Sequence, residues 1–230
     1  MAEFDPIDAW ARYCRLVAED PARFDNPSDG NIEILFDDDS VAAAQAAAGA
    51  ARSARGLAAG DLRAGVLAED PYMTYVRDAV RFADGSAGLY NRILEGPCVA
   101  VLPVLERRLV LIRIFRHGLR AWSWEAPRGD VRPDEPHTEA AARELREEIG
   151  AEAVAFRDLG RFTPGGASLG ILGHLVLAEI DGIGPLSRAE SIVRTHEVSA
   201  DEMGRMIAEG QIYDGFTIAL FARARLKGLI

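Results

Sequence analysis

The sequence predicts an α/β fold in which a mixed β-sheet carries a helix on each face. Short apolar runs separated by turn residues recur between residues 72 and 198, and such runs are typical of strands. A Glu-rich amphipathic helix interrupts this series near residue 145, and a second helix follows the last strand near residue 220. With 230 residues and 49% hydrophobic composition, the chain has enough apolar material for a buried core.

The composition is acidic and argues against several classes of partner. A net charge of −10 opposes a nucleic-acid partner, because nucleic acids are held largely by cationic side chains. No stretch approaches the roughly 20 apolar residues of a membrane span, and the acidic N-terminus lacks the basic region of a signal peptide. Cys14 and Cys98 have no metal-ligand spacing, so we expect buried thiols in a reducing compartment. We therefore expect a cytoplasmic protein with no membrane partner.

Residues 1–66 are predicted to form a small helical extension before the main domain. An amphipathic helix is expected at its start, and the Asp20-Pro21 pair ends it. A short strand is expected over 32–36, where apolar residues alternate with others. From 40 to 60 the many alanines favour a helix, whereas three glycines weaken it. We predict a loosely held helix or a mobile linker there.

The apolar runs after residue 71 are expected to be strands. A turn centred on Asp84 and Gly85 joins two of them into a hairpin. Two near-continuous runs that follow the hairpin indicate strands buried on both faces. Ser199, with Glu202 three residues later, predicts a capped helix. The predicted strands span 72–82, 89–94, 99–105, 109–115, 122–125, 156–162, 171–180 and 193–198, and the last helix spans 214–226.

Residues 129–151 are the stretch around which the rest of the chain is organised. A loop crowded with Gly, Pro and Asp precedes a run of Ala, Glu, Arg and Leu, which are good helix formers. We expect Thr138 to be the N-cap of this helix. Gly150 is expected to end it, because glycine adopts the left-handed conformation that closes many helices.

Three carboxylates of this helix, from Glu144, Glu147 and Glu148, fall on one stripe of its surface at about 100° per residue. Like charges three and four residues apart destabilise a helix unless something neutralises them. One possibility is a solvated acidic face paired with Arg143 and Arg146. The other is a hard divalent cation, because Mg²⁺ and Mn²⁺ prefer carboxylate and water oxygens.

The whole stretch resembles the signature of the Nudix hydrolase family, Gly-x5-Glu-x7-Arg-Glu-hydrophobic-x-Glu-Glu-x-Gly-hydrophobic, at every fixed position. The fixed positions are filled by Gly129, Glu135, Arg143, Glu144, Leu145, Glu147, Glu148, Gly150 and Ala151. The resemblance implies an α/β/α sandwich over residues 67–230 and hydrolysis of a nucleoside diphosphate linked to another moiety. Mg²⁺ or Mn²⁺ is the implied cofactor.

The resemblance also implies a role for each residue of the signature. Glu144, Glu147 and Glu148 would be metal ligands, together with the main-chain carbonyl of Arg128. Glu135 and Arg143 would pair to hold the loop against the helix, and these two are structural. Gly129 and Gly150 would likewise shape the backbone.

Within the family, the chain is most similar to the ADP-ribose pyrophosphatase group, which implies hydrolysis of ADP-ribose to AMP and ribose 5-phosphate by a homodimer. The stretches that carry this similarity are 113–116 with 122–127, Pro164 after the helix, and 209–217. Arg116 is the preferred phosphate contact and Arg113 a second candidate, although an odd spacing places them on opposite faces of a strand. Tyr72 could supply an aromatic shelf for adenine.

In the ADP-ribose pyrophosphatase group the general base is commonly a Glu on a mobile loop after the last long strand. Residues 182–191 resemble this loop and have Glu190 as their only acid, so the base is assigned to Glu190, with Glu147 or Glu148 as the alternative. A base must accept a proton, and the helix carboxylates would be occupied by cations. Alternatives for the whole chain are a Nudix hydrolase of a sugar nucleotide, a dinucleoside polyphosphate or coenzyme A. A further alternative is a nucleotide-binding regulatory sensor without catalysis.

Overall fold

The computed structural model describes residues 6–58 and 60–230, and the chain divides into two compact units. The first unit contains residues up to Glu95 together with Gly165–Gly170, and the second contains Gly96–Pro164 and Ile171–Ile230. The expected boundary at residue 66 lies inside the first unit, because the strands after it pair with one another there. The extent of the catalytic domain before residue 95 stays a prediction.

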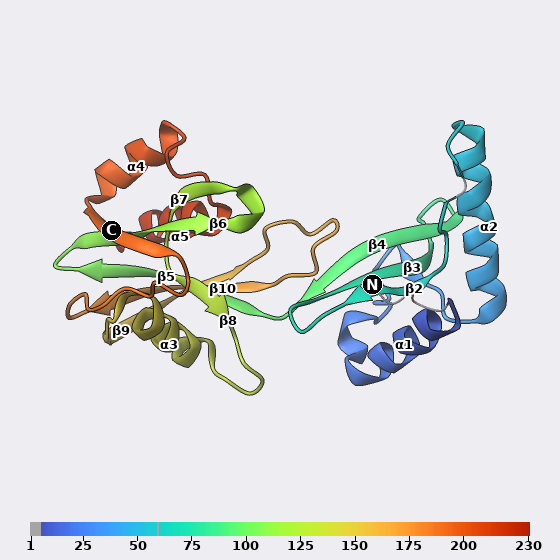
Figure 1. Cartoon of the computed structure of the whole chain (residues 1–230), viewed down its shortest axis with the longest axis horizontal. Helices are drawn as coiled ribbons and strands as arrows, with labels where there is room; N and C mark the ends of the chain where they lie inside the picture. The colour runs from blue at the N-terminus through green and yellow to red at the C-terminus, as the bar shows by residue number, and fades with distance from the viewer. Residues whose placement is uncertain (1–5, 59) are drawn as a thin grey trace. The chain divides into compact units, whose positions relative to one another are not determined.

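The first unit is a four-stranded antiparallel sheet with two helices (Figure 1). The long central strand β3 pairs with β4 on one side and with β1 and β2 on the other. The predicted hairpin is present as β3 and β4. The elements are α1 (Pro6–Glu19), η1 (Pro21–Arg23), β1 (Glu33–Ile34), α2 (Asp38–Ala54), β2 (Gly65–Glu69), β3 (Met73–Arg81) and β4 (Ala87–Glu95).

Helix α2 decides between the two alternatives left open for residues 40–60. It is a regular helix of 17 residues, capped by Asp37, whose side chain accepts a hydrogen bond from the Ser40 amide at 2.8 Å. Val41 and Ala44 are its buried residues. The high helix propensity of alanine therefore prevails over Gly49, which lies within the helix.

The second unit is a seven-stranded mixed sheet with helices on both faces (Figure 1). Strand β5 runs parallel to β10, whereas the other pairs are antiparallel. The strands are β5 (Cys98–Leu105), β6 (Arg108–Arg116), β7 (Ala121–Glu125), β8 (Arg128–Asp130), β9 (Ala153–Phe162), β10 (Gly173–Ile180) and β11 (Ile192–Val198). The helices are η2 (His117–Leu119), α3 (His137–Ile149), α4 (Ala200–Ala208) and α5 (Gly215–Leu226).

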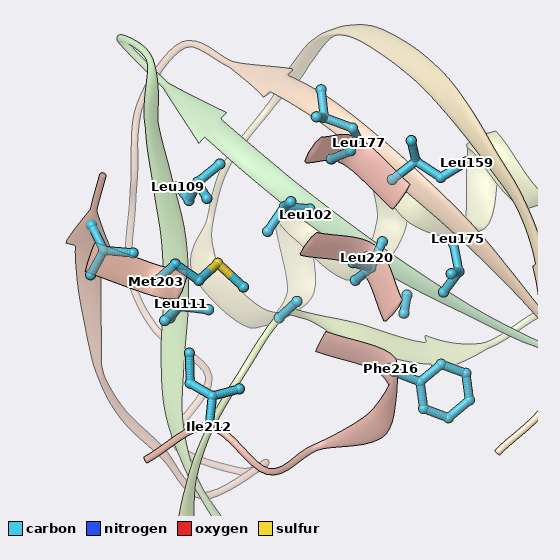
Figure 2. Packing of buried hydrophobic residues seen from close by; sticks show 14 of the residues in the cluster. Leu102, Leu109, Leu111, Leu159, Leu175, Leu177, Met203, Ile212, Phe216 and Leu220 are labelled. Carbon is cyan, nitrogen blue, oxygen red and sulfur yellow. The ribbon is translucent and has the colours of Figure 1, made fainter. Parts of the chain in front are cut away.

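The two faces of this sheet bury separate apolar clusters, as the near-continuous apolar runs predicted. In β5, Val99 and Val101 belong to the cluster under α3, whereas Leu102 belongs to the cluster under α4 and α5. Figure 2 shows this second cluster, in which Met203 and Leu220 meet the leucines of the sheet. The alternation of side chains along a strand thus places α3 and α5 on opposite faces.

Two local expectations are corrected, and a third is confirmed. Helix α3 begins at His137 with Pro136 as its N-cap, so Thr138 is inside the helix, because the fixed backbone of a proline suits a helix start. Cys14 is exposed, because it lies on the outer side of α1. Gly150 does end α3, with φ at +61°. Among residues 6–58 and 60–230, no helix is both long and apolar enough to cross a membrane.

Candidate active site

The loop before α3 is fastened to the helix by an ion pair between Glu135 and Arg143. Arg143 donates to both carboxylate oxygens of Glu135, at 3.0 and 3.1 Å, and a third donor is the Arg132 amide at 2.9 Å. The hydrogen bond from Arg143 is the largest cause that lowers the pKa of Glu135 to about 2. The loop and the helix are therefore held as one piece at neutral pH.

Glu144 lies at the inner edge of the carboxylate stripe, against the backbone of the loop. It is buried, and a side chain at position 129 would overlap its carboxyl group, so Gly129 makes room for it. Arg143 donates to Glu144 and to Glu147, the latter at 3.0 Å. Glu147 remains exposed. In this arrangement Arg143 shields two of the three like charges.

Glu148 is the most buried carboxylate of the stripe and lies outside the hydrogen bonds that Arg143 donates. It is 1% exposed, and among the residues that the structure describes its Oε2 atom has no hydrogen-bond partner. Burial, followed by repulsion from Glu190 and Glu144, raises the pKa of Glu148 to about 9. Burial also raises the pKa of Glu144. An unpaired carboxylate in such a place is costly unless a proton or a cation joins it.

Glu190 is brought to this stripe by the loop between β10 and β11. It is exposed, and its charge is among the causes that raise the pKa values of Glu148 and Glu144. The loop is fastened to the end of α3, because the Ser187 amide donates to the Glu148 carbonyl at 3.1 Å and the Gly184 amide donates to the Ile149 carbonyl at 2.9 Å. Four carboxylates thus share one region of the second unit.

Arg116 lies on the α3 side of the sheet, next to the buried Glu125. It donates two hydrogen bonds to Oε2 of Glu125, at 2.9 and 2.6 Å, and its charge lowers the pKa of Glu148 against the effect of burial. Its Nη1 has no partner among the residues that the structure describes. One donor of this guanidinium is therefore available to a ligand.

The sequence reasoning gave no role to a network that continues from Glu125. Arg128 lies 3.5 Å from Glu125 and 3.1 Å from Asp214, which caps α5 by accepting from the Thr217 amide. The Thr217 hydroxyl in turn accepts from the Ala126 amide at 2.9 Å. This network holds the end of β7 and the start of β8 against α5, just before the loop that leads into α3. In the sequence, the network was indicated only by the similarity of residues 122–127 and 209–217 to the ADP-ribose pyrophosphatase group.

Arg113 is not brought to the carboxylates. Its guanidinium stacks on the Trp124 ring at 5.1 Å, and Arg194 stacks on the same ring at 5.0 Å. Ile114 and Arg116 alternate with it and lie on the α3 side, so Arg113 belongs to the opposite face.

The two remaining predicted binding residues are both exposed. Tyr72 is 78% exposed and belongs to the first unit. Pro164 lies in the loop after β9 in the second unit. Their part in binding stays a prediction.

The donor set at the stripe fits a hard divalent cation. As the side chains stand, no three of the described Asp, Glu, His and Cys residues converge on one point, since Arg143 engages Glu144 and Glu147. In the described part of the chain, however, the buried Oε2 of Glu148 has no hydrogen-bond partner, and Gly129 leaves the Glu144 carboxylate close to the main chain. Oxygen-only donors of this kind suit Mg²⁺ or Mn²⁺.

Comparisons with known proteins give the family and the fold of the chain. The model of the NUDIX domain matches residues 95–208. The ADP-ribose pyrophosphatase of Bacillus subtilis is 26% identical over 157 residues, which cover 66% of this chain and 84% of that protein. The ADP compounds hydrolase NudE of Escherichia coli is 32% identical over 73 residues, which cover 31% of this chain and 39% of that protein. A crystal structure of an ADP compounds hydrolase has the same fold, with a TM-score of 0.62 at 21% identity over 71% of this chain and 91% of that one.

Proposed function

Because this chain belongs to the Nudix hydrolases, we propose that it cleaves the diphosphate of ADP-ribose to give AMP and ribose 5-phosphate. The observation that carries the proposal is the buried Glu148, whose pKa is raised by burial and by the charges of Glu190 and Glu144. The similarity to an ADP-ribose pyrophosphatase and to an ADP compounds hydrolase supports an ADP-containing substrate.

The proposed cation ligands are Glu144, Glu147 and Glu148, with the carbonyl of Arg128. A bound Mg²⁺ or Mn²⁺ would polarise the diphosphate and neutralise the charge that develops on its oxygens. Occupation of the site requires Arg143 to release Glu144 and Glu147, while its pairing with Glu135 keeps the guanidinium in place.

Arg116 and Glu190 are proposed to act on the substrate and on the attacking water. The free Nη1 of Arg116 can donate a charge-assisted hydrogen bond to a phosphate oxygen. Glu190 is exposed near Glu148, so it can accept the proton of a water that attacks phosphorus. The oxygen of that water is retained in one product, and the bond between phosphorus and the bridging oxygen breaks.

The direct test is incubation of the purified chain with ADP-ribose and Mg²⁺, followed by separation of the products. We expect AMP and ribose 5-phosphate in equal amounts, with no product in EDTA. The same assay is run with a sugar nucleotide, a dinucleoside polyphosphate and coenzyme A. If one of these compounds is hydrolysed faster than ADP-ribose, that compound is the substrate instead. Nucleotide binding without any turnover would instead indicate a sensor.

We also propose a cytoplasmic homodimer, in which the first unit supplies the contact between subunits. Tyr72 and Met73, at the start of β3, are 78% and 44% exposed, and exposed aromatic and methionine side chains are frequent at interfaces. Light scattering at micromolar concentration is expected to give twice the mass of one chain, which is 24.9 kDa. A single-chain mass under assay conditions would contradict the dimer.

A further inference from the structure

The first unit contains a cavity of about 630 Å³ between helix α2 and the strands β3 and β4. Its volume is in the range of small-molecule sites. Alanines of α2, three leucines and Phe82 provide an apolar lining, and Asn91 and Ser86 provide polar groups. All of these residues belong to one unit, so the cavity is complete within it.

The charged groups that line this cavity are all cationic. They are Arg52, Arg55 and Arg77, and none of the described residues that line it is acidic. This is unexpected in a chain with a net charge of −10. Two of these arginines lie at the C-terminal end of α2, with Arg52 in its last turn and Arg55 as its C-cap. Cations are favourable there because the helix dipole is negative at this end. The dipole does not account for Arg77, which comes from β3.

Arg77 is a buried cation whose guanidinium is held in one orientation. It is 8% exposed, and it donates to Asn91 Oδ1 at 2.9 Å and to the carbonyls of Asp61 and Arg63 at 2.9 and 3.1 Å. The Asp61 carboxylate is 3.9 Å from its Nη1. Within the described part of the chain, Nη2 has no hydrogen-bond partner, yet it is not sealed from solvent. A preorganised donor therefore remains available.

We propose that this cavity binds a small organic anion, with its carboxylate or phosphate group at Arg77 and Arg55 and its apolar body against Phe82 and the alanines of α2. The remaining Nη2 donor of this fixed guanidinium can give a charge-assisted hydrogen bond to an oxyanion, and the positive charge of Arg55 lines the same cavity. An apolar lining with few polar groups favours an aromatic or aliphatic body. The site lies outside the catalytic unit and does not depend on the proposed hydrolysis.

The test uses the full-length chain in EDTA with the fluorescent anion 8-anilinonaphthalene-1-sulfonate as probe. We expect saturable binding of one probe per chain. The double variant Arg52→Gln/Arg55→Gln should weaken it about tenfold, and Ala48→Phe, which fills the cavity, should abolish it. The matched control is Arg81→Gln. Arg81 is an exposed arginine of β3, the strand that carries Arg77, and it pairs with Glu33 outside the cavity. This variant should bind the probe with the wild-type affinity.

Competition identifies the anionic group. Phenyl phosphate or benzoate should displace the probe, and the stronger competitor shows whether a phosphate or a carboxylate is preferred. Benzyl alcohol, which has the ring without the charge, should not displace it. The proposal is overturned by an absence of saturable binding, by unchanged affinity in both cavity variants, or by displacement that is as strong with benzyl alcohol as with the anions.

Discussion

Asp78 in the first unit and Glu148 in the second are equally buried carboxylates, each 1% exposed, with opposite surroundings. Asp78 accepts from the Tyr13 hydroxyl at 2.5 Å and from Arg92 at 2.5 and 2.9 Å. Glu148 has a free oxygen and two acidic neighbours. Burial alone therefore does not identify a functional carboxylate, whereas burial without a partner points to a missing ligand.

The largest expected effect comes from Glu148→Gln. This change keeps the size of the side chain and removes the negative charge that a cation needs, so kcat should fall by about 10³-fold or more. The rate is measured with ADP-ribose and saturating Mg²⁺. Circular dichroism should show an intact fold, because no hydrogen bond to Oε2 is lost. Turnover near the wild-type rate would contradict the assignment of Glu148 to the cation.

Asp78→Asn is the matching change in the first unit, and its effect should be on stability. The amide leaves the half-buried Arg92 without its counter-ion, and breaking a pair whose carboxylate is buried costs up to about 3–5 kcal/mol. Denaturant unfolding measures the loss. An unchanged free energy of unfolding would show that the closed network of Tyr13, Asp78 and Arg92 is not structural.

Glu190→Gln is expected to lower kcat by about 10²-fold, the usual effect of losing a positioned base. The affinity for Mn²⁺ and the KM for ADP-ribose should stay within several-fold, because the ligands on α3 are unchanged. Both are measured on the same preparation. If Glu147→Gln abolishes turnover while Glu190→Gln leaves it near normal, the base lies on the helix.

The two arginines of β6 give a smaller contrast. Arg116→Gln should lower kcat/KM about tenfold, the effect of one charge-assisted hydrogen bond, whereas Arg113→Gln should stay within twofold because its guanidinium lies on Trp124. The melting temperature of each variant controls for folding, since Arg116 also pairs with Glu125. Equal losses in both variants would place the two side chains at one site.

Much of this organisation follows from local patterns. Apolar alternation predicts the strands and the two buried faces, and the spacing within 129–151 predicts the carboxylate stripe. The environment of Glu148 could not be predicted, because it depends on a loop that returns about 40 residues later. The network through Glu125 and Asp214 likewise joins segments far apart in sequence. The regular helix α2 was uncertain because alanine and glycine favour opposite outcomes.

The role of Glu148 as a buried carboxylate that a cation completes is tested most directly by thermal unfolding between pH 5 and pH 9. The folded-state pKa of Glu148 is raised to about 9 from an ordinary value of 4.5, so the folded chain favours the protonated form. Its stabilising contribution is therefore full below about pH 4.5 and is lost as the pH rises toward 9.

In EDTA, the melting temperature of the wild type should fall toward pH 9 relative to Glu148→Gln, which cannot ionise at this position. Saturating Mg²⁺ should remove the difference by stabilising the wild type alone. The two melting curves are expected to diverge in EDTA, and Mg²⁺ is expected to bring the wild-type curve back to that of the variant. Parallel curves in EDTA, together with equal Mg²⁺ stabilisation of both proteins, would contradict it.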